Sequence, residues 1–119
     1  MAYDEYLADR VGHALQEKGV DFYAKKMFGG LCYMVDEKMC CGILHIKAKA
    51  ADVLMARIGE DAYPEAILKF GAMPMDFTGR TMRGYVFVTM EGVDTDDELA
   101  YWIQLCVDFN PIAKSSNTI

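Results

Sequence analysis

The sequence predicts a single α+β domain, in which a mainly antiparallel sheet carries helices on one face. Two long amphipathic segments frame the chain, and short apolar segments with strand-like alternation lie between them. Tight polar turns join several of these segments, and tight turns connect antiparallel strands. The predicted order of elements is α-β-β-β-β-α-β-α, within one domain spanning residues 1–119.

The first helix is predicted over residues 3–18, because apolar side chains recur there at helical spacing and Gly19 is a favourable residue after a helix end. The predicted stripe consists of Tyr3, Leu7, Val11, Ala14 and Leu15. Four strands follow at residues 23–27, 31–35, 39–46 and 53–58, with a polar turn at 36–38. Alternation places Val53, Met55 and Arg57 on one face and Leu54, Ala56 and Ile58 on the other. The connection at residues 47–52 could be a loop or one helical turn.

A second helix is predicted over residues 61–69, with Pro64 in its first turn and Gly71 after its end. Residues 73–79 read as irregular, and residues 82–89 as the last strand. Thr95 and Glu98 form a capping box that begins the final helix, which Asn110-Pro111 ends. We expect a frayed tail over residues 110–119. The core-facing residues of the final helix are Leu99, Trp102, Ile103, Cys106 and Val107.

Composition excludes several classes of protein. The net charge is −6, and no lysine or arginine occurs from Met90 through Pro111. We therefore do not expect the chain to bind nucleic acid directly. No apolar run approaches the roughly 20 residues of a membrane helix, and the acidic start differs from a signal peptide. We therefore expect a cytoplasmic protein without membrane contact, and we expect its four cysteines to be buried reduced thiols.

Cysteines and a histidine on the predicted strands form the candidate metal and nucleophile site. Cys41 and His45 share a strand face with Ile43, whereas alternation places Cys40 on the opposite face. Cys32 across the hairpin could add a third ligand, but no CxxC spacing occurs, and zinc needs three or four ligands. A Cys-His nucleophile needs an accessible thiol and an oriented base. We assign no catalytic, cofactor-binding or metal-binding residue, and thiol chemistry at Cys40 or Cys41 remains an alternative.

Basic residues define a candidate anion or ligand site. Arg80 and Arg83 lie between Gly79 and Gly84, and guanidinium groups suit carboxylate or phosphate. Arg57 and Lys25 lie at strand positions that could join them. The alternative is that these bases pair with the excess carboxylates or lie in solvent. The acidic run at residues 94–98 is explained by helix capping.

Two adjacent glycines carry structural information. Gly29 and Gly30 follow Met27 and Phe28 between two strands, where glycine permits a bend or a bulge. Phosphate cradles usually need a helix after the glycines, and a strand follows here. We therefore interpret this hairpin as structural.

The chain resembles the N-terminal domain of the TfoX/Sxy family. Residues 26–35, which contain Met27-Phe28-Gly29-Gly30, carry the resemblance together with residues 39–42, 75–88 and 97–102. Residues 75–88 contain Gly79-Arg80-Thr81-Met82-Arg83-Gly84. The resemblance as a whole runs from Leu7 to Ser116. It implies a two-layer fold similar to that of secretion chaperones.

Named members of the family regulate competence genes and carry a second, helical C-terminal domain. We expect this chain to be a stand-alone member, for which the resemblance implies a non-enzymatic regulatory domain. Such a domain would act through protein partners, with a homodimer and a role in transcription as expectations. The family's N-terminal domain supplies no catalytic residue to transfer. The alternatives are an anion-binding domain that uses Arg57, Arg80 and Arg83, and the thiol chemistry named above.

Overall fold

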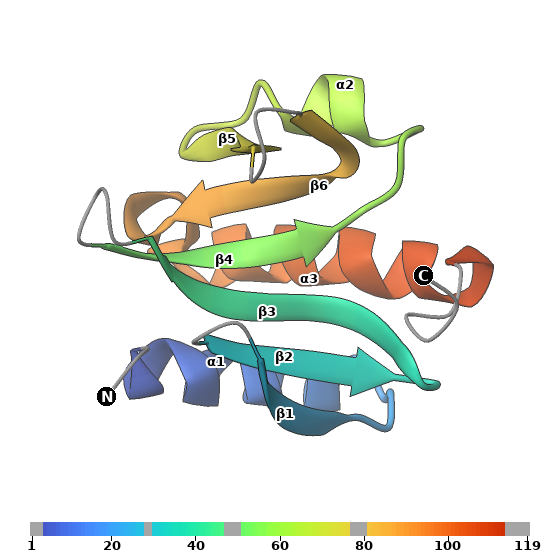
Figure 1. Ribbon diagram of the computed structural model, residues 1–119. Coiled ribbons are helices and arrows are strands. Elements are labelled where there is room, and N and C mark those ends of the chain that lie inside the picture. Colours follow the sequence, from blue (N-terminus) through green and yellow to red (C-terminus); the bar gives the residue numbers. More distant parts are fainter. Residues whose placement is uncertain (1–3, 28–29, 47–50, 77–80, 114–119) are drawn as a thin grey trace.

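The computed structural model describes residues 4–27, 30–46, 51–76 and 81–113 and shows helices layered on one face of a sheet (Figure 1). The six strands pair antiparallel throughout, in the order β1-β2-β3-β4-β6-β5, which confirms the predicted fold class. In chain order the elements are α1 (Glu5–Glu17), β1 (Tyr23–Met27), β2 (Gly30–Val35), β3 (Lys38–Ile46), β4 (Ala51–Arg57), α2 (Tyr63–Ala66), β5 (Ala72–Asp76), β6 (Thr81–Thr89), η2 (Met90–Val93), α3 (Asp96–Phe109) and η3 (Asn110–Ile112).

The predicted capping box of α3 and the glycine after α1 are confirmed, whereas α1 begins at Glu5, behind an Asp4 cap, rather than at residue 3. The Asp4 side chain accepts hydrogen bonds from the backbone of Tyr6 and Leu7 at the start of α1, and Gly19 follows the helix at φ +75°. Thr95 and Glu98 make the complete capping box of α3. These ends fix which residues of each helix face the sheet.

A β-bulge in β3 overturns the prediction for Cys40. Tyr33 pairs with Cys41, and Met34 pairs with Met39, so Cys40 is an extra residue without a partner in β2. Both Cys40 and Cys41 therefore belong to the helix-side core, although strict alternation placed Cys40 on the opposite face. The alternation predicted for β4 is confirmed, because Val53 and Met55 lie in one cluster and Leu54, Ala56 and Ile58 in the other.

Three further predictions need correction. The segment predicted as irregular contains β5, an edge strand in which Pro74 is tolerated because one side of an edge strand needs no backbone donor. The second helix is a single turn, Tyr63–Ala66, rather than residues 61–69. Asn110–Ile112 form a 3-10 helix, with Asn110 buried and donating to the Val35 carbonyl at 3.2 Å. The predicted frayed tail is therefore wrong for residues 110–113, and residues 47–50 and 114–119 lie outside the described residues.

The apolar core has one part on each face of the sheet. On the helix side, α1 and α3 pack over Tyr33, Cys41, Ala56 and Val86, which form one row across the strands. The only tryptophan, Trp102, is 1% exposed within this part. The opposite face carries a smaller cluster of Cys32, Met34, Leu44, Val53, Met55, Met75 and Phe87. Among the described elements, no helix covers that face (Figure 1).

Candidate functional site

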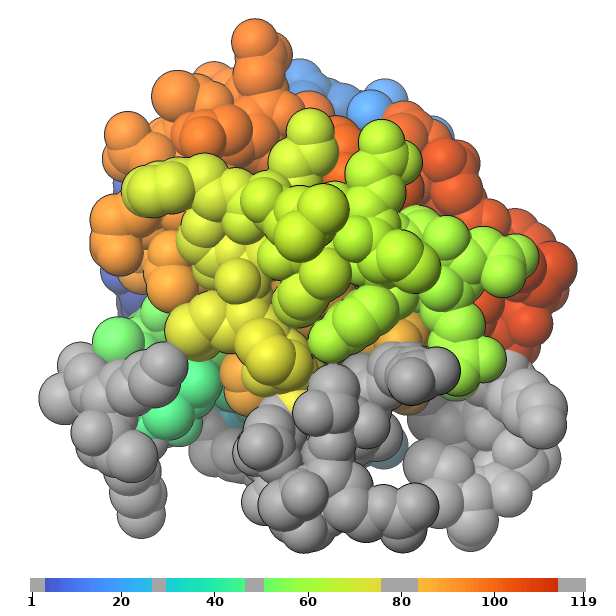
Figure 2. Space-filling model, turned by 90° about the horizontal axis from the view of Figure 1, so that it is seen from above, coloured from blue at the N-terminus to red at the C-terminus, as the bar shows by residue number. Residues whose placement is uncertain are grey.

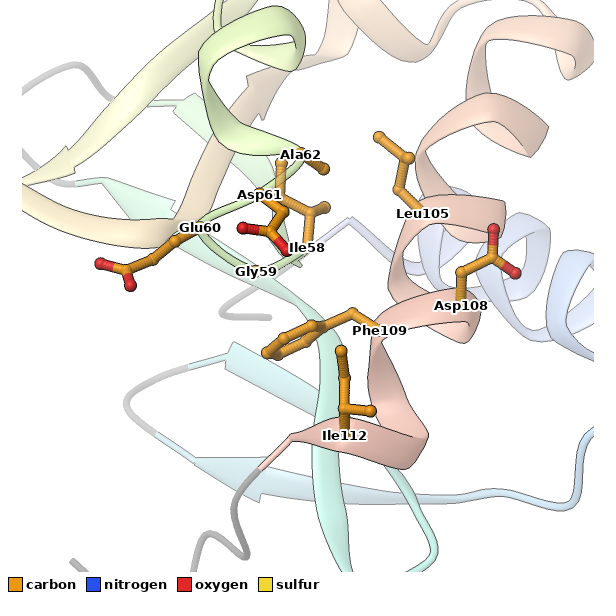
Figure 3. Close-up of a pocket in the computed structure, with 9 residues that line it drawn as sticks. All are labelled: Ile58, Gly59, Glu60, Asp61, Ala62, Leu105, Asp108, Phe109 and Ile112. Atoms are coloured by element: carbon orange, nitrogen blue, oxygen red, sulfur yellow. The ribbon is translucent and has the colours of Figure 1, made fainter.

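A surface hollow lies where the connection from β4 to α2 meets the C-terminal end of α3. Its volume is about 410 Å³, and we call it the acidic groove (Figure 3). The groove is lined by Ile58, Gly59, Glu60, Asp61, Ala62, Leu105, Asp108, Phe109 and Ile112. Two segments that are far apart in the sequence thus form its two walls.

Two glycines let the walls of the acidic groove approach closely. Gly59 has φ +86°, and a Cβ there would lie within 2.6 Å of the Phe109 ring atom Cε1. The Gly84 carbonyl accepts hydrogen bonds from Ile58 N at 2.8 Å and Gly59 N at 3.0 Å. Gly84 itself has φ +93° and lies against Gly59. Gly84 therefore holds one wall of the groove in place.

Carboxylates lie on the rim of the groove above an apolar floor. Ala62, Leu105 and Phe109 are half-buried, whereas Ile112 is 74% exposed. Asp61 lies on the wall that connects β4 to α2, Asp108 lies on the α3 side, and Glu60 points outward (Figure 3). The Gln104 amide donates to Asp108 Oδ1 at 2.7 Å and so orients that carboxylate. No lining residue is basic, and none of the three carboxylates forms an ion pair within the described residues.

A second hollow, of about 350 Å³, lies on the other side of α2, toward the N-terminal end of α3. Seen from above, residues 58–76 occupy the middle of this face, between the two ends of α3 (Figure 2). The Lys69 ammonium lies 4.9 Å from the centre of the Tyr101 ring in this hollow. The second hollow therefore contains its own cation, unlike the acidic groove. Leu68 and Phe70 beside it are 83% and 71% exposed.

The candidate anion residues are only partly placed by the structure. Lys25 lies on β1 and Arg57 on β4, with β2 and β3 between them, so about 14 Å of sheet separates the two strands. Arg57 lies over the rings of Tyr85 and Phe109, at 5.6 and 5.9 Å, and donates to the Met39 carbonyl at 3.4 Å. Lys25 and Arg57 thus do not converge, while Gly79, Arg80 and the Arg83 side chain lie outside the described residues.

Three thiols gather where the β3 bulge faces α3. Cys40, Cys41 and Cys106 are at most 1% exposed and belong to the same core cluster. Hydrogen bonds donated by the Cys106 and Cys41 thiols, with help from the Arg57 charge, hold the pKa of Cys40 below its usual range, although burial opposes this. Hydrogen bonding within the trio and burial raise the pKa of Cys41 and of Cys106. Of the three thiols, Cys40 is therefore the one whose ionised form its surroundings favour.

The other metal and nucleophile candidates are kept apart. Cys32 lies in the cluster on the opposite face of the sheet, and burial raises the pKa of its thiol. His45 contacts Asp52 at 2.8 Å between Nδ1 and Oδ1, and it lies four residues, about 13 Å, along β3 from buried Cys41. No group of three potential ligands that could hold a metal ion occurs among the described residues. Sequence reasoning missed the acidic groove, because its walls come from residues 58–62 and 105–112.

The chain forms a small α+β domain whose groove is open at the surface rather than an enclosed cavity. The TfoX N-terminal domain family matches residues 15–110, and the chain belongs to this family. A comparison with curated proteins gives no match. No helix in the described parts of the chain is long and apolar enough to cross a bilayer.

Proposed function

We propose that this protein is a non-enzymatic interaction domain that acts through protein partners in regulation, including the regulation of transcription. Family membership supports this proposal, and the exposed apolar side chains around α2 carry it. Leu68, Phe70 and Ile112 are each more than 70% exposed; Phe70 lines the second hollow and Ile112 lines the acidic groove. The proposal takes them as parts of an apolar interaction surface, because large exposed apolar patches mark such sites. A cytoplasmic location and a homodimer are parts of the same proposal.

Partner capture tests this proposal. The full-length chain, tagged and crosslinked in its own cells, is expected to enrich one protein in a fixed ratio. Leu68→Ser with Phe70→Ser should reduce that enrichment, whereas Asp21→Asn, an exposed change between α1 and β1, should not. Sedimentation of the purified chain distinguishes a homodimer from a heteromeric partner. A monodisperse monomer that enriches no protein would overturn the proposal.

Thiol chemistry at Cys40 and Cys41 is a second candidate, because the β3 bulge brings both residues to Cys106. Thiolate absorbance in the far ultraviolet tests it. We expect thiolate at neutral pH in the folded chain, its loss in Cys40→Ser, and its retention in Cys32→Ser, because only Cys40 has a lowered pKa. Reaction with a thiol reagent then shows whether this group is accessible. A folded chain without thiolate at neutral pH would eliminate the candidate.

A further inference from the structure

We propose that the acidic groove is the docking site for a protein segment that presents a basic side chain beside an apolar one. This inference rests on the proposed function and names the partner's chemistry. Asp61 and Asp108 lie on opposite walls, and no lining residue neutralises them. The groove therefore lacks the cation that the second hollow receives from Lys69. A basic side chain from a partner would supply that cation.

The floor of the groove selects for apolar surface as well. Leu105, Phe109 and Ile112 present hydrocarbon between the carboxylates. Lysine and arginine place their methylene stems along such a surface while the charged head lies at the rim. An arginine fork can also make charge-assisted hydrogen bonds to a carboxylate. A segment with alternating basic and apolar residues could contact the apolar floor with one set of side chains and pair with the carboxylates of the rim through the other.

Other occupants fit less well. The groove is open on its outer side, whereas small-molecule sites bury most of their ligand. A nucleic acid would bring phosphates against carboxylates. A second copy bound through this face would set Asp61 and Asp108 against the same two residues, because a two-fold interface is self-complementary. Like charges placed opposite one another disfavour that interface.

The wall containing Gly59 is held in position before any partner arrives. The Gly84 carbonyl accepts hydrogen bonds from the backbone N–H groups of Ile58 and Gly59. The Phe109 ring packs directly against Gly59. Binding therefore costs little ordering of the groove backbone, which favours a short segment with modest contact area. Rigid walls also mean that charge can be removed from the rim without remodelling the floor.

The test uses three pentapeptides and amide chemical shifts of the full-length chain. The probes are acetyl-Leu-Arg-Leu-Lys-Leu-amide, its glutamate analogue with Glu for both bases, and its serine analogue with Ser for each Leu. We expect the first to shift the amides of residues 59–62, 105–110 and 112 selectively. Asp61→Asn with Asp108→Asn should weaken its binding about fivefold, because each exposed ion pair contributes modestly. Raising salt from about 0.05 M to about 0.3 M should also weaken binding.

The control is Asp21→Asn with Glu91→Gln, which removes the same charge from exposed positions outside the groove. This variant should bind like the wild type. Three results would overturn the inference. The two double variants could weaken binding equally, the glutamate or serine analogue could bind as well as the first peptide, or spermine alone could cause the same shifts. Shifts of the groove amides that follow protein concentration alone would assign the face to a second copy and also overturn it. If the Asp61→Asn/Asp108→Asn variant captures the cellular partner at wild-type levels, the groove assignment fails while the proposed function stands.

Discussion

Single glycines set the tolerance of this fold to substitution. Gly30 begins β2, and a Cβ there would collide with the Ile43 carbonyl oxygen of the neighbouring strand. Gly12 lies within α1, where a Cβ would lie 3.8 Å from the Phe22 ring, an ordinary contact distance. The same substitution should therefore have opposite effects at these two positions.

Gly30→Ala is expected to destabilise the protein by about 3 kcal/mol or more, because backbone strands must separate to admit the methyl group. Gly12→Ala should stabilise it by about 0.5–1 kcal/mol through helix propensity. Urea unfolding of both variants measures the difference. Similar stabilities for the two variants would contradict the strand contact.

The capping box predicts a pH dependence at one carboxylate. The Thr95 backbone N–H and hydroxyl each donate to Glu98 Oε1 at 3.0 Å, and together they lower the pKa of Glu98. The ionised form therefore stabilises the folded state fully above its usual pKa of 4.5, and this contribution is lost as pH falls through the lowered value. The loss occurs below pH 4.5.

Comparison of wild type with Glu98→Gln should accordingly show a Tm difference near pH 7 that shrinks toward about pH 3. Thr95→Ala should cost about 1 kcal/mol near pH 7 and should abolish the pH-dependent part of the Glu98→Gln effect. A Tm difference that stays constant over this range would show that Glu98 makes no ionised cap.

At the scale of elements, Arg57 joins four parts of the fold. It extends from β4, donates to β3, and lies over rings from β6 and α3. Arg57→Met should lower the free energy of unfolding by about 1–3 kcal/mol, because the loss of this half-buried charged donor removes the hydrogen bond to the Met39 carbonyl. Lys25→Met, on exposed β1, should change stability by less than about 0.5 kcal/mol. Equal effects in thermal unfolding would contradict this role of Arg57.

The elements also show what the sequence could and could not predict. Periodicity and caps identified α1, α3 and most strands, because these signals are local. The Cys40 bulge was missed because it depends on how β3 pairs with β2, and alternation assumes an unbroken ladder. β5 was missed because Pro74 argues against a strand unless the strand is known to lie at an edge. The acidic groove depends on residues more than 40 positions apart meeting in space.

At the scale of the whole molecule, the helix-side core joins both ends of the described chain. Leu7 of α1 and Trp102 of α3 belong to one cluster with the central strands. We therefore expect cooperative unfolding, in which Trp102 fluorescence and far-ultraviolet circular dichroism give the same urea midpoint. Two separate transitions would indicate that the helices and the sheet unfold independently. Leu68→Ala, an exposed change, should leave the midpoint almost unchanged.

The position of α3 in the chain has a consequence for biosynthesis. All six strands leave the ribosome before the helix that covers much of their helix-side face, so Val86, Val88 and Ala56 are made before their packing partners Trp102 and Ile103. During that interval the nascent sheet presents an uncovered apolar surface, which is the kind of surface that chaperones bind. A translational pause that holds α3 inside the ribosomal exit tunnel after the strands have emerged should therefore prolong that exposure and lower the yield of soluble protein.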